Sequence, residues 1–223
     1  MEFFRKLGKI NIRSIILNFR LFSFKQAIYL PLIVSRNIKI TEIWRGGVQI
    51  NTKTLFPGMI QLGYSDVGTI NIKQFPSVLQ ISKRGKLVFN GKCHIGAGCN
   101  ISVGVSGKLE FGESFNCSGR TAFIAHKNIS FGNECLVSWG CTFMDSDFHK
   151  IKKDGYVLNE TADIKINKNS WIGCNCNILK GSELPANSVL GAGSLLNKKY
   201  SEEKCIYAGV PAKQLVQGIE WEK

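Results

Sequence analysis

Large aliphatic and small residues recur at a fixed spacing of six between residues 166 and 195. Cutting this stretch every six residues gives INKNSW, IGCNCN, ILKGSE, LPANSV and LGAGSL, so each block begins with Ile or Leu and has Ser or Cys in its fifth place. This period is neither helical nor the simple alternation of a flat sheet. It predicts an all-β fold, a parallel β-helix, in which each block forms one short strand and a bend and three blocks form one turn.

The same pattern sets the expected domain organisation. A looser six-residue repeat runs from 87 to 149, and irregular β-rich runs with Gly at the bends precede it. We therefore expect a basic, helical or irregular N-terminal segment at 1–40, a β-helix domain at 41–199, and a tail at 200–223. The last ten or so residues are expected to form a short C-terminal helix that closes the prism.

The register breaks at the sequence FMDSDFH, which ends at His149. If the repeat continued, Asp147 would occupy the small inward position, where an unpaired carboxylate is costly. The chain is therefore expected to leave the coil here, and the polar sequence that follows predicts a projecting loop at about 150–163. A local break in an otherwise consistent pattern is where a functional site is expected.

Residues 1–40 alternate apolar clusters with basic residues and contain a single acidic residue, Glu2. The basic residues are Arg5, Lys6, Lys9, Arg13, Arg20, Lys25, Arg36 and Lys39. No uncharged apolar run reaches the roughly 20 residues of a membrane-spanning helix. Two interpretations remain open and are compatible: the segment covers the open end of the β-helix, or it rests on an anionic membrane surface.

Charge and cysteine content narrow the function classes. The formal net charge is +13, but the lysines beyond residue 40 are scattered and no nucleic-acid-binding module is recognisable, so we expect no nucleic-acid partner. Such a surface suits a phosphate-bearing cosubstrate, an acidic sugar or a lipid-linked glycan. The eight cysteines contain no CxxC pair, and several fall on the small repeat position, which predicts reduced thiols and a cytoplasmic protein.

The run WIGCNCNILKGSELPANSVLGAGSLLNKK followed by AGVPAK resembles the hexapeptide-repeat acyltransferases, which include maltose, galactoside and xenobiotic acetyltransferases and serine acetyltransferase. The resemblance covers about 85–215. The N-terminal segment and MDSDFHKI look more like the bacterial surface-polysaccharide O-acetyltransferases. The resemblance implies a left-handed β-helix, a homotrimer, acetyl-CoA as donor, and transfer of an acetyl group to a sugar or glycan hydroxyl.

The family places a catalytic histidine in a groove between adjacent subunits, and His149 matches it. A neutral imidazole near pH 7 can take the proton of a sugar hydroxyl as that hydroxyl attacks the thioester. A carboxylate on one ring nitrogen would leave the other free to accept. Asp147 and Asp145 are both candidates for this role, and we favour Asp147.

The resemblance also assigns positions near acetyl-CoA. Trp171 and Gly173 match the pantetheine groove, and Gly191 and Ala192 match a turn whose backbone approaches it. Two further matches are Asn197 with Lys198, where Asn replaces the commoner Thr, and Lys213 in the tail. Lysines are suited to the phosphates of coenzyme A.

Two rival functions use the same fold. A zinc-dependent carbonic anhydrase would need three histidines, and the chain has His94, His126 and His149, but their spacing does not fit and no metal site is expected. A non-catalytic scaffold docked at the membrane is the other rival. It would have no reason to interrupt its coils with two carboxylates and a histidine.

Overall fold

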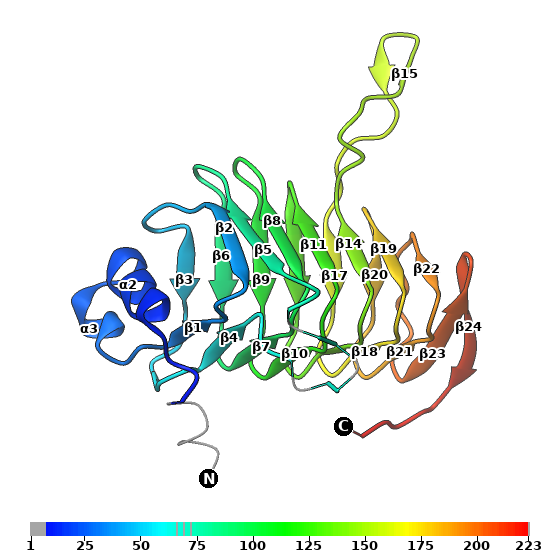
Figure 1. Cartoon of the computed structure of the whole chain (residues 1–223). Coiled ribbons are helices and arrows are strands. Elements are labelled where there is room, and N and C mark those ends of the chain that lie inside the picture. The colour runs from blue at the N-terminus through cyan, green and yellow to red at the C-terminus, as the bar shows by residue number, and fades with distance from the viewer. Residues whose placement is uncertain (1–7, 66, 69, 72, 223) are drawn as a thin grey trace.

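The computed structural model describes residues 8–65, 67–68, 70–71 and 73–222. These residues form a three-sided prism of short parallel strands, wound so that successive coils stack along one axis (Figure 1). Each coil contributes one strand to each side, except at the C-terminal end, where no strand of the third face follows β22 (Leu195–Leu196) among the described residues. The strand pairings join each strand to the equivalent strand of the next coil, as the six-residue repeat predicts.

The three sides of the prism are three sheets. The first face holds β1 (Leu32–Val34), β4 (Ile60–Leu62), β7 (Cys93–Ile95), β10 (Phe115–Cys117), β13 (Leu136–Val137), β18 (Trp171–Ile172), β21 (Val189–Leu190), β23 (Cys205–Gly209) and β24 (Ala212–Gln217). The second holds β2 (Ile38–Glu42), β5 (Ser77–Ile81), β8 (Asn100–Val103), β11 (Ala122–Ala125), β14 (Thr142–Met144), β19 (Asn177–Leu179) and β22 (Leu195–Leu196). The third holds β3 (Val48–Ile50), β6 (Lys86–Phe89), β9 (Lys108–Phe111), β12 (Asn128–Phe131), β17 (Ile164–Ile166) and β20 (Glu183–Leu184).

The repeat positions behave as the sequence predicts. The residues that begin the five blocks are at most 1% exposed: Ile166, Ile172, Ile178, Leu184 and Leu190. The serines of the fifth place are buried at the corners, where each hydroxyl donates to a carbonyl oxygen two or three residues before it. The small fifth position therefore favours serine, because the hydroxyl forms a hydrogen bond with a main-chain carbonyl at the bend.

All eight cysteines are free thiols, and seven of them are buried. Cys176 shows what the thiol does at the fifth place, since its Sγ lies 3.1 Å from the carbonyl oxygen of Gly191 on the next coil. Burial raises the pKa of Cys93 well above the ordinary thiol value. The seven buried cysteines are compact core residues, and Cys174 is partly exposed.

The N-terminal segment covers the open end of the prism with α2 (Ile12–Leu21) and α3 (Phe24–Ala27). The edge strand β1 is paired by the side chains of α2. The Nδ2 of Asn18 donates to the carbonyl of Leu32 at 2.7 Å, its Oδ1 accepts from the amide of Leu32, and the hydroxyl of Ser14 accepts from the amide of Val34. The helix thus caps the first coil, and the prism begins at Leu32, inside the segment 1–40.

Replacing Asn18 with Ala is expected to lower the free energy of unfolding by roughly 2–4 kcal/mol, because the buried amide and carbonyl of Leu32 would both lose their partner. Urea denaturation of wild type and variant measures the difference. Asn51→Ala, which truncates an exposed asparagine, is the matched control and should change stability little. Equal stability of the two variants would contradict this role of Asn18.

The prediction of a C-terminal helix is wrong. Residues Ala212–Gln217 form strand β24, which turns back and pairs antiparallel with β23. The last coil ends at β23, whose outer edge would otherwise be unpaired, and β24 supplies its hydrogen-bond partners. Pairing of an exposed edge overrides local helix propensity here. Within the described residues, no helix has the length and apolar character needed to cross a bilayer.

Candidate active site

The register break at FMDSDFH is the point where the chain leaves the prism. After β14 it departs at the corner between the second and third faces and returns at β17. A short antiparallel hairpin of β15 (Lys152–Lys153) and β16 (Tyr156–Val157) lies in this loop and stands clear of the coils (Figure 1). The structure therefore has a projecting loop where the sequence predicts one.

Asp145 is buried at the base of this loop. Its two carboxylate oxygens accept hydrogen bonds from the amides of His126 and Lys127, at 2.7 and 2.8 Å. Burial raises the pKa of Asp145, and these hydrogen bonds oppose the rise. The carboxylate ties the departing loop to the same corner of the preceding coil, so its contacts are structural.

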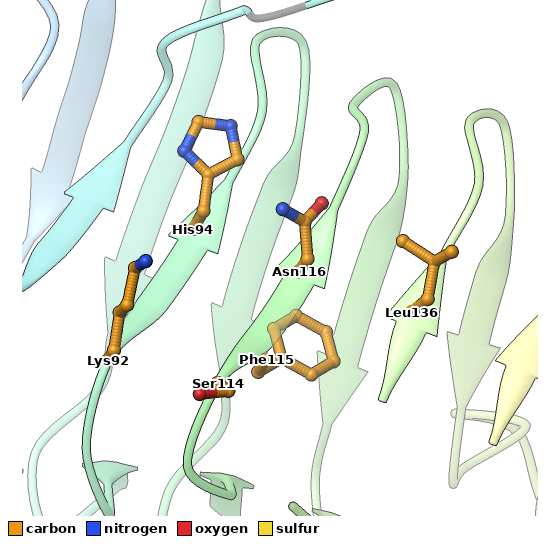
Figure 2. Close-up of a pocket in the computed structure, with 6 residues that line it drawn as sticks. All are labelled: Lys92, His94, Ser114, Phe115, Asn116 and Leu136. Carbon is orange, nitrogen blue, oxygen red and sulfur yellow. The ribbon is translucent and has the colours of Figure 1, made fainter. Parts of the chain in front are cut away.

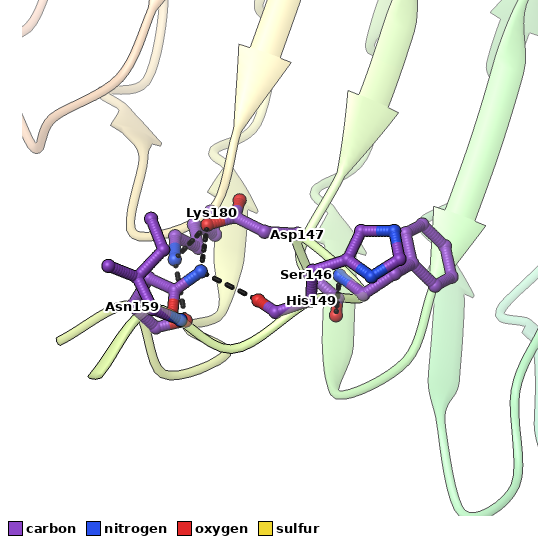
Figure 3. A network of polar contacts seen from close by, with 7 residues as sticks. Ser146, Asp147, His149, Asn159 and Lys180 are labelled. Atoms are coloured by element: carbon purple, nitrogen blue, oxygen red, sulfur yellow. Dashed lines mark hydrogen bonds and ion pairs between the residues drawn. The ribbon is translucent and has the colours of Figure 1, made fainter. Parts of the chain in front are cut away.

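Asp147 lies in a polar network that closes the loop (Figure 3). Its Oδ2 accepts from the Nζ of Lys180 at 2.7 Å and from the Nδ2 of Asn159 at 2.8 Å. The same Nδ2 donates to the carbonyl of His149, and Lys180 also donates to the carbonyl of Asn159, both at 2.8 Å. Lys180 and Asn159 hold the pKa of Asp147 below its ordinary value. Three segments are thereby joined at the loop base.

His149 is exposed, and the contacts that fix it involve its main chain. Its amide donates to the carbonyl of Asp147 at 2.7 Å and its carbonyl accepts from Asn159, whereas no hydrogen bond of its ring is found among the described residues. Phe148 before it has a left-handed backbone (φ 61°) and packs its ring edge against His126, with centroids 4.6 Å apart. The loop presents an imidazole whose two nitrogens are open.

The structure corrects the expected carboxylate–imidazole contact. Neither Asp145 nor Asp147 binds the ring of His149, because Asp145 is held by backbone amides and Asp147 by Lys180 and Asn159. Among the described residues, Asp147 contacts His149 at the main chain, directly through its carbonyl oxygen and by way of Asn159.

Replacing Asp147 with Asn is expected to speed tryptic cleavage of the loop, at Lys150, Lys152 or Lys153, roughly two- to fivefold, because the variant loses the ion pair with Lys180. Asp163→Asn, which removes a similarly exposed ion pair with Lys127, is the matched control. In wild type the ion pair needs the ionised carboxylate. It is present above the ordinary carboxyl pKa and is lost only as pH falls through the lowered value. Equal cleavage rates in wild type and Asp147→Asn would contradict this role of Asp147.

The residues expected near the cosubstrate form two groups on opposite edges of the second face. Asn197 and Lys198 lie at the corner that carries the loop, and the Nζ of Lys198 is 5.0 Å from the ring centroid of Tyr200. At the other edge, Gly173 must lack a side chain, since a Cβ there would lie 2.6 Å from the amide nitrogen of Ala192. Gly191 borders the same corner, and Lys213 lies across from Ala208 on the closing hairpin.

Trp171 lies on the outer side of the first face. It is 38% exposed, its Nε1 donates to the hydroxyl of Ser138 at 3.3 Å, and its ring lies 6.0 Å from that of Trp221. The structure therefore does not gather all the predicted residues at one place within one chain. His149, Asp147, Asp145, Asn197 and Lys198 lie along one corner of the prism, and the remaining residues lie across the second face or on the first.

Two hollows lie on the surface near these elements. One, of about 410 Å³, lies on the first face and is lined by Lys92, His94, Ser114, Phe115, Asn116 and Leu136 (Figure 2). The other, of about 300 Å³, lies beside the loop base on the third face, where Lys127, Lys165 and Lys199 line it together with Asp163 and Glu183. The second hollow includes Lys127, Ala162 and Asp163 at the loop base, and His149 does not line it. Among the described residues, no three His, Cys, Asp or Glu side chains are grouped to hold a metal ion.

Comparisons with known proteins agree with this architecture. No family model matches the chain. An uncharacterised 24.8 kDa protein in the cps region of Klebsiella pneumoniae is 27% identical over 204 residues, which cover 92% of this chain and 87% of that protein. The solved structure of the polySia-specific acetyltransferase NeuO is 19% identical with a TM-score of 0.56, over 85% of this chain and 89% of that chain.

Two further structures are similar. The polysialic acid O-acetyltransferase OatWY is 22% identical with a TM-score of 0.55, over 84% of this chain and 88% of that one. A maltose O-acetyltransferase from Clostridium difficile 630 is 21% identical with a TM-score of 0.50, over 58% and 67%. The chain has the fold of the hexapeptide-repeat acetyltransferases. The prediction of an all-β, left-handed β-helix of hexapeptide repeats is confirmed.

Within this hexapeptide-repeat fold, sequence reasoning missed two residues of the loop network, Asn159 and Lys180. The strand register contained a signal for Lys180. Met144 pairs with Leu179, so the corner that carries Asp145 lies beside Lys180 on the next coil. Counting one coil across the loop would have placed this lysine near the two carboxylates. Asn159 lies within the loop, where no repeat predicts position.

Proposed function

We propose that this protein is an acetyl-CoA-dependent O-acetyltransferase that acetylates a sugar hydroxyl in surface-polysaccharide assembly. The observation that carries the proposal is His149, whose main chain is fixed by Asp147 and Asn159 while its side chain is exposed and its ring makes no hydrogen bond among the described residues. The shared fold with two polysialic acid acetyltransferases and a maltose O-acetyltransferase supports it, as does the similarity to a protein in a cps region. Eight free thiols agree with a reducing, cytoplasmic location.

The reaction requires one general base, which takes the proton of the acceptor hydroxyl. A ring nitrogen of His149 takes the proton of the acceptor hydroxyl as its oxygen bonds to the thioester carbonyl carbon. The tetrahedral oxyanion then collapses, the carbon–sulfur bond breaks, and the imidazolium returns the proton to the departing thiolate. The products are the acetyl ester and coenzyme A with a free thiol.

Binding of the acyl donor needs cationic side chains and accessible main chain. Lys198 and Lys213 are exposed and are suited to phosphate oxygens. Gly191 is partly exposed and Ala192 is exposed at this corner, and neither has a side chain beyond Cβ, so an extended pantetheine arm can approach the main chain there, whereas Gly173 is buried against Ala192. These residues fit acetyl-CoA as the acyl donor.

A homotrimer would unite the two groups of residues. The loop carries four exposed apolar side chains, which are Phe148 (56%), Ile151 (58%), Tyr156 (77%) and Leu158 (62%). A projecting hairpin with this composition is suited to packing against another copy. The loop of one copy would then face the glycine corner of its neighbour, and the groove between copies would hold donor and acceptor together.

The test is release of coenzyme A thiol from acetyl-CoA by the purified protein, with a panel of neutral and acidic sugars and lipid-linked glycans as acceptors. We expect release that depends on the acceptor and exceeds the rate without protein. If no acceptor supports release and calorimetry detects no binding of acetyl-CoA, the scaffold alternative is favoured instead.

A further inference from the structure

The capping helix α2 is apolar on both of its sides. Its inner side packs Leu17 and Leu21 on the first coil, beside the buried Ser14 and Asn18. Its outer side carries four apolar residues at i, i+3, i+4 and i+7. They are Ile12 (72% exposed), Ile15 (36%), Ile16 (58%) and Phe19 (47%). A helix that only covers a prism end needs a polar outer side, so this second stripe is unexplained by capping.

The stripe continues onto α3. Phe24 is 72% exposed, and its ring centroid lies 6.0 Å from that of Phe19. We call the five side chains Ile12, Ile15, Ile16, Phe19 and Phe24 the α2–α3 patch. Ile28 and Tyr29, which follow α3, are also exposed, at 53% and 47%. Clusters of exposed apolar side chains on one surface mark interaction sites.

The segment that carries the patch is basic, and the first carboxylate after it is Glu42, between Ile40 and Ile43. Residues 8–41 contain no Asp or Glu. They contain Lys9, Arg13, Arg20, Lys25, Arg36 and Lys39. Arg13 and Arg20 also line a hollow of about 340 Å³ whose other lining residues are aliphatic: Ile12, Ile16, Leu17, Ile40 and Ile43. The Nη1 of Arg13 donates to the carbonyl of Ile38, and Arg20, beside the aliphatic lining, is suited to a phosphate headgroup above a hydrocarbon chain.

We propose that the α2–α3 patch docks the protein onto an anionic lipid bilayer, lying flat in the headgroup region. A helix with an apolar stripe and flanking basic residues is the form that interfacial binding takes. Basic residues near the surface add attraction to anionic headgroups. The patch lies at the free end of the prism, beyond the first coil (Figure 1), where a flat surface can reach it. A two-fold contact with a second copy would oppose two clusters of positive charge, and the charge therefore favours lipid.

The experiment is co-sedimentation of the full chain with vesicles of phosphatidylcholine alone or mixed with phosphatidylglycerol. Wild type should sediment with the anionic vesicles and remain in the supernatant with the neutral ones. Binding should weaken as salt is raised. Phe19→Asp/Phe24→Asp should lower the partition coefficient roughly tenfold or more, because two side chains leave the apolar contact and two negative charges are added.

Two further variants make the test specific. Leu215→Asp, at a residue that is 63% exposed on β24, is the matched control and should bind like wild type. Arg20→Gln/Lys25→Gln keeps the apolar stripe and should weaken binding about fivefold for each charge removed. The proposal is overturned if the wild-type protein does not bind anionic vesicles, or if both patch variants bind as the wild-type protein does. It is also overturned if the aspartate pair lowers the molecular mass measured by light scattering, which would make the patch an interface between copies.

Discussion

Replacing His149 with Ala is expected to lower the turnover number for acceptor acetylation by about 10²–10⁴, the range that a positioned general base contributes. The ring makes no hydrogen bond among the described residues, and the main chain of His149 is held by Asn159 and Asp147, so the loop should keep its structure. The Michaelis constant for acetyl-CoA should change little. Steady-state thiol release at saturating donor measures both constants.

His94→Ala is the matched control for this variant. His94 is a half-buried histidine of β7 on the first face, away from the loop corner. Its replacement should leave turnover near the wild-type value. Unchanged turnover in His149→Ala, or an equal loss in both variants together with normal folding, would remove the assigned role of His149.

Replacing Phe111 with Ala is expected to lower the free energy of unfolding by roughly 3–5 kcal/mol, since a fully buried phenyl ring is removed from a close-packed interior. Phe111 is at the centre of an aromatic cluster. Its ring centroid lies 4.4 Å from that of Phe115, 5.4 Å from Phe123 and 5.3 Å from Phe131, on three different strands. Urea denaturation at a fixed protein concentration measures the effect.

Phe24→Ala is the matched control for the aromatic core. The same ring is removed there from a side chain that is 72% exposed, so stability should change by less than about 0.5 kcal/mol. Similar losses for Phe111→Ala and Phe24→Ala would mean that the interior aromatics do not carry the stability of the coils.

The stretch 166–195 could be read in detail from sequence, because each repeat position has one physical requirement. The interior of the prism requires Ile or Leu at the start of each block, and the corner requires a small side chain. The looser repeat before it was still regular enough to show the break at Asp147. Where every position is constrained by its neighbours on adjacent coils, periodicity alone gives strand, face and register.

The features that could not be predicted from the sequence depend on interaction partners that lie at no fixed spacing along the chain. Strand β24 forms because β23 has an unpaired edge, a fact of the completed prism that residues 212–217 do not encode by themselves. The bond between Asp147 and Lys180 crosses an inserted loop of irregular length. The pairing of β1 by Asn18 depends on how the helix docks. In each case tertiary geometry decides the partner.

The most direct measurement of the central claim follows an isotope-labelled acetyl group from acetyl-CoA into the acceptor by NMR, with coenzyme A thiol titrated in parallel. The account predicts an acetyl ester on a sugar oxygen, one thiol released for each ester formed, and formation of both products nearly abolished in His149→Ala. Label found on nitrogen, or released as free acetate without acetylated acceptor, would contradict an O-acetyltransferase that works through His149.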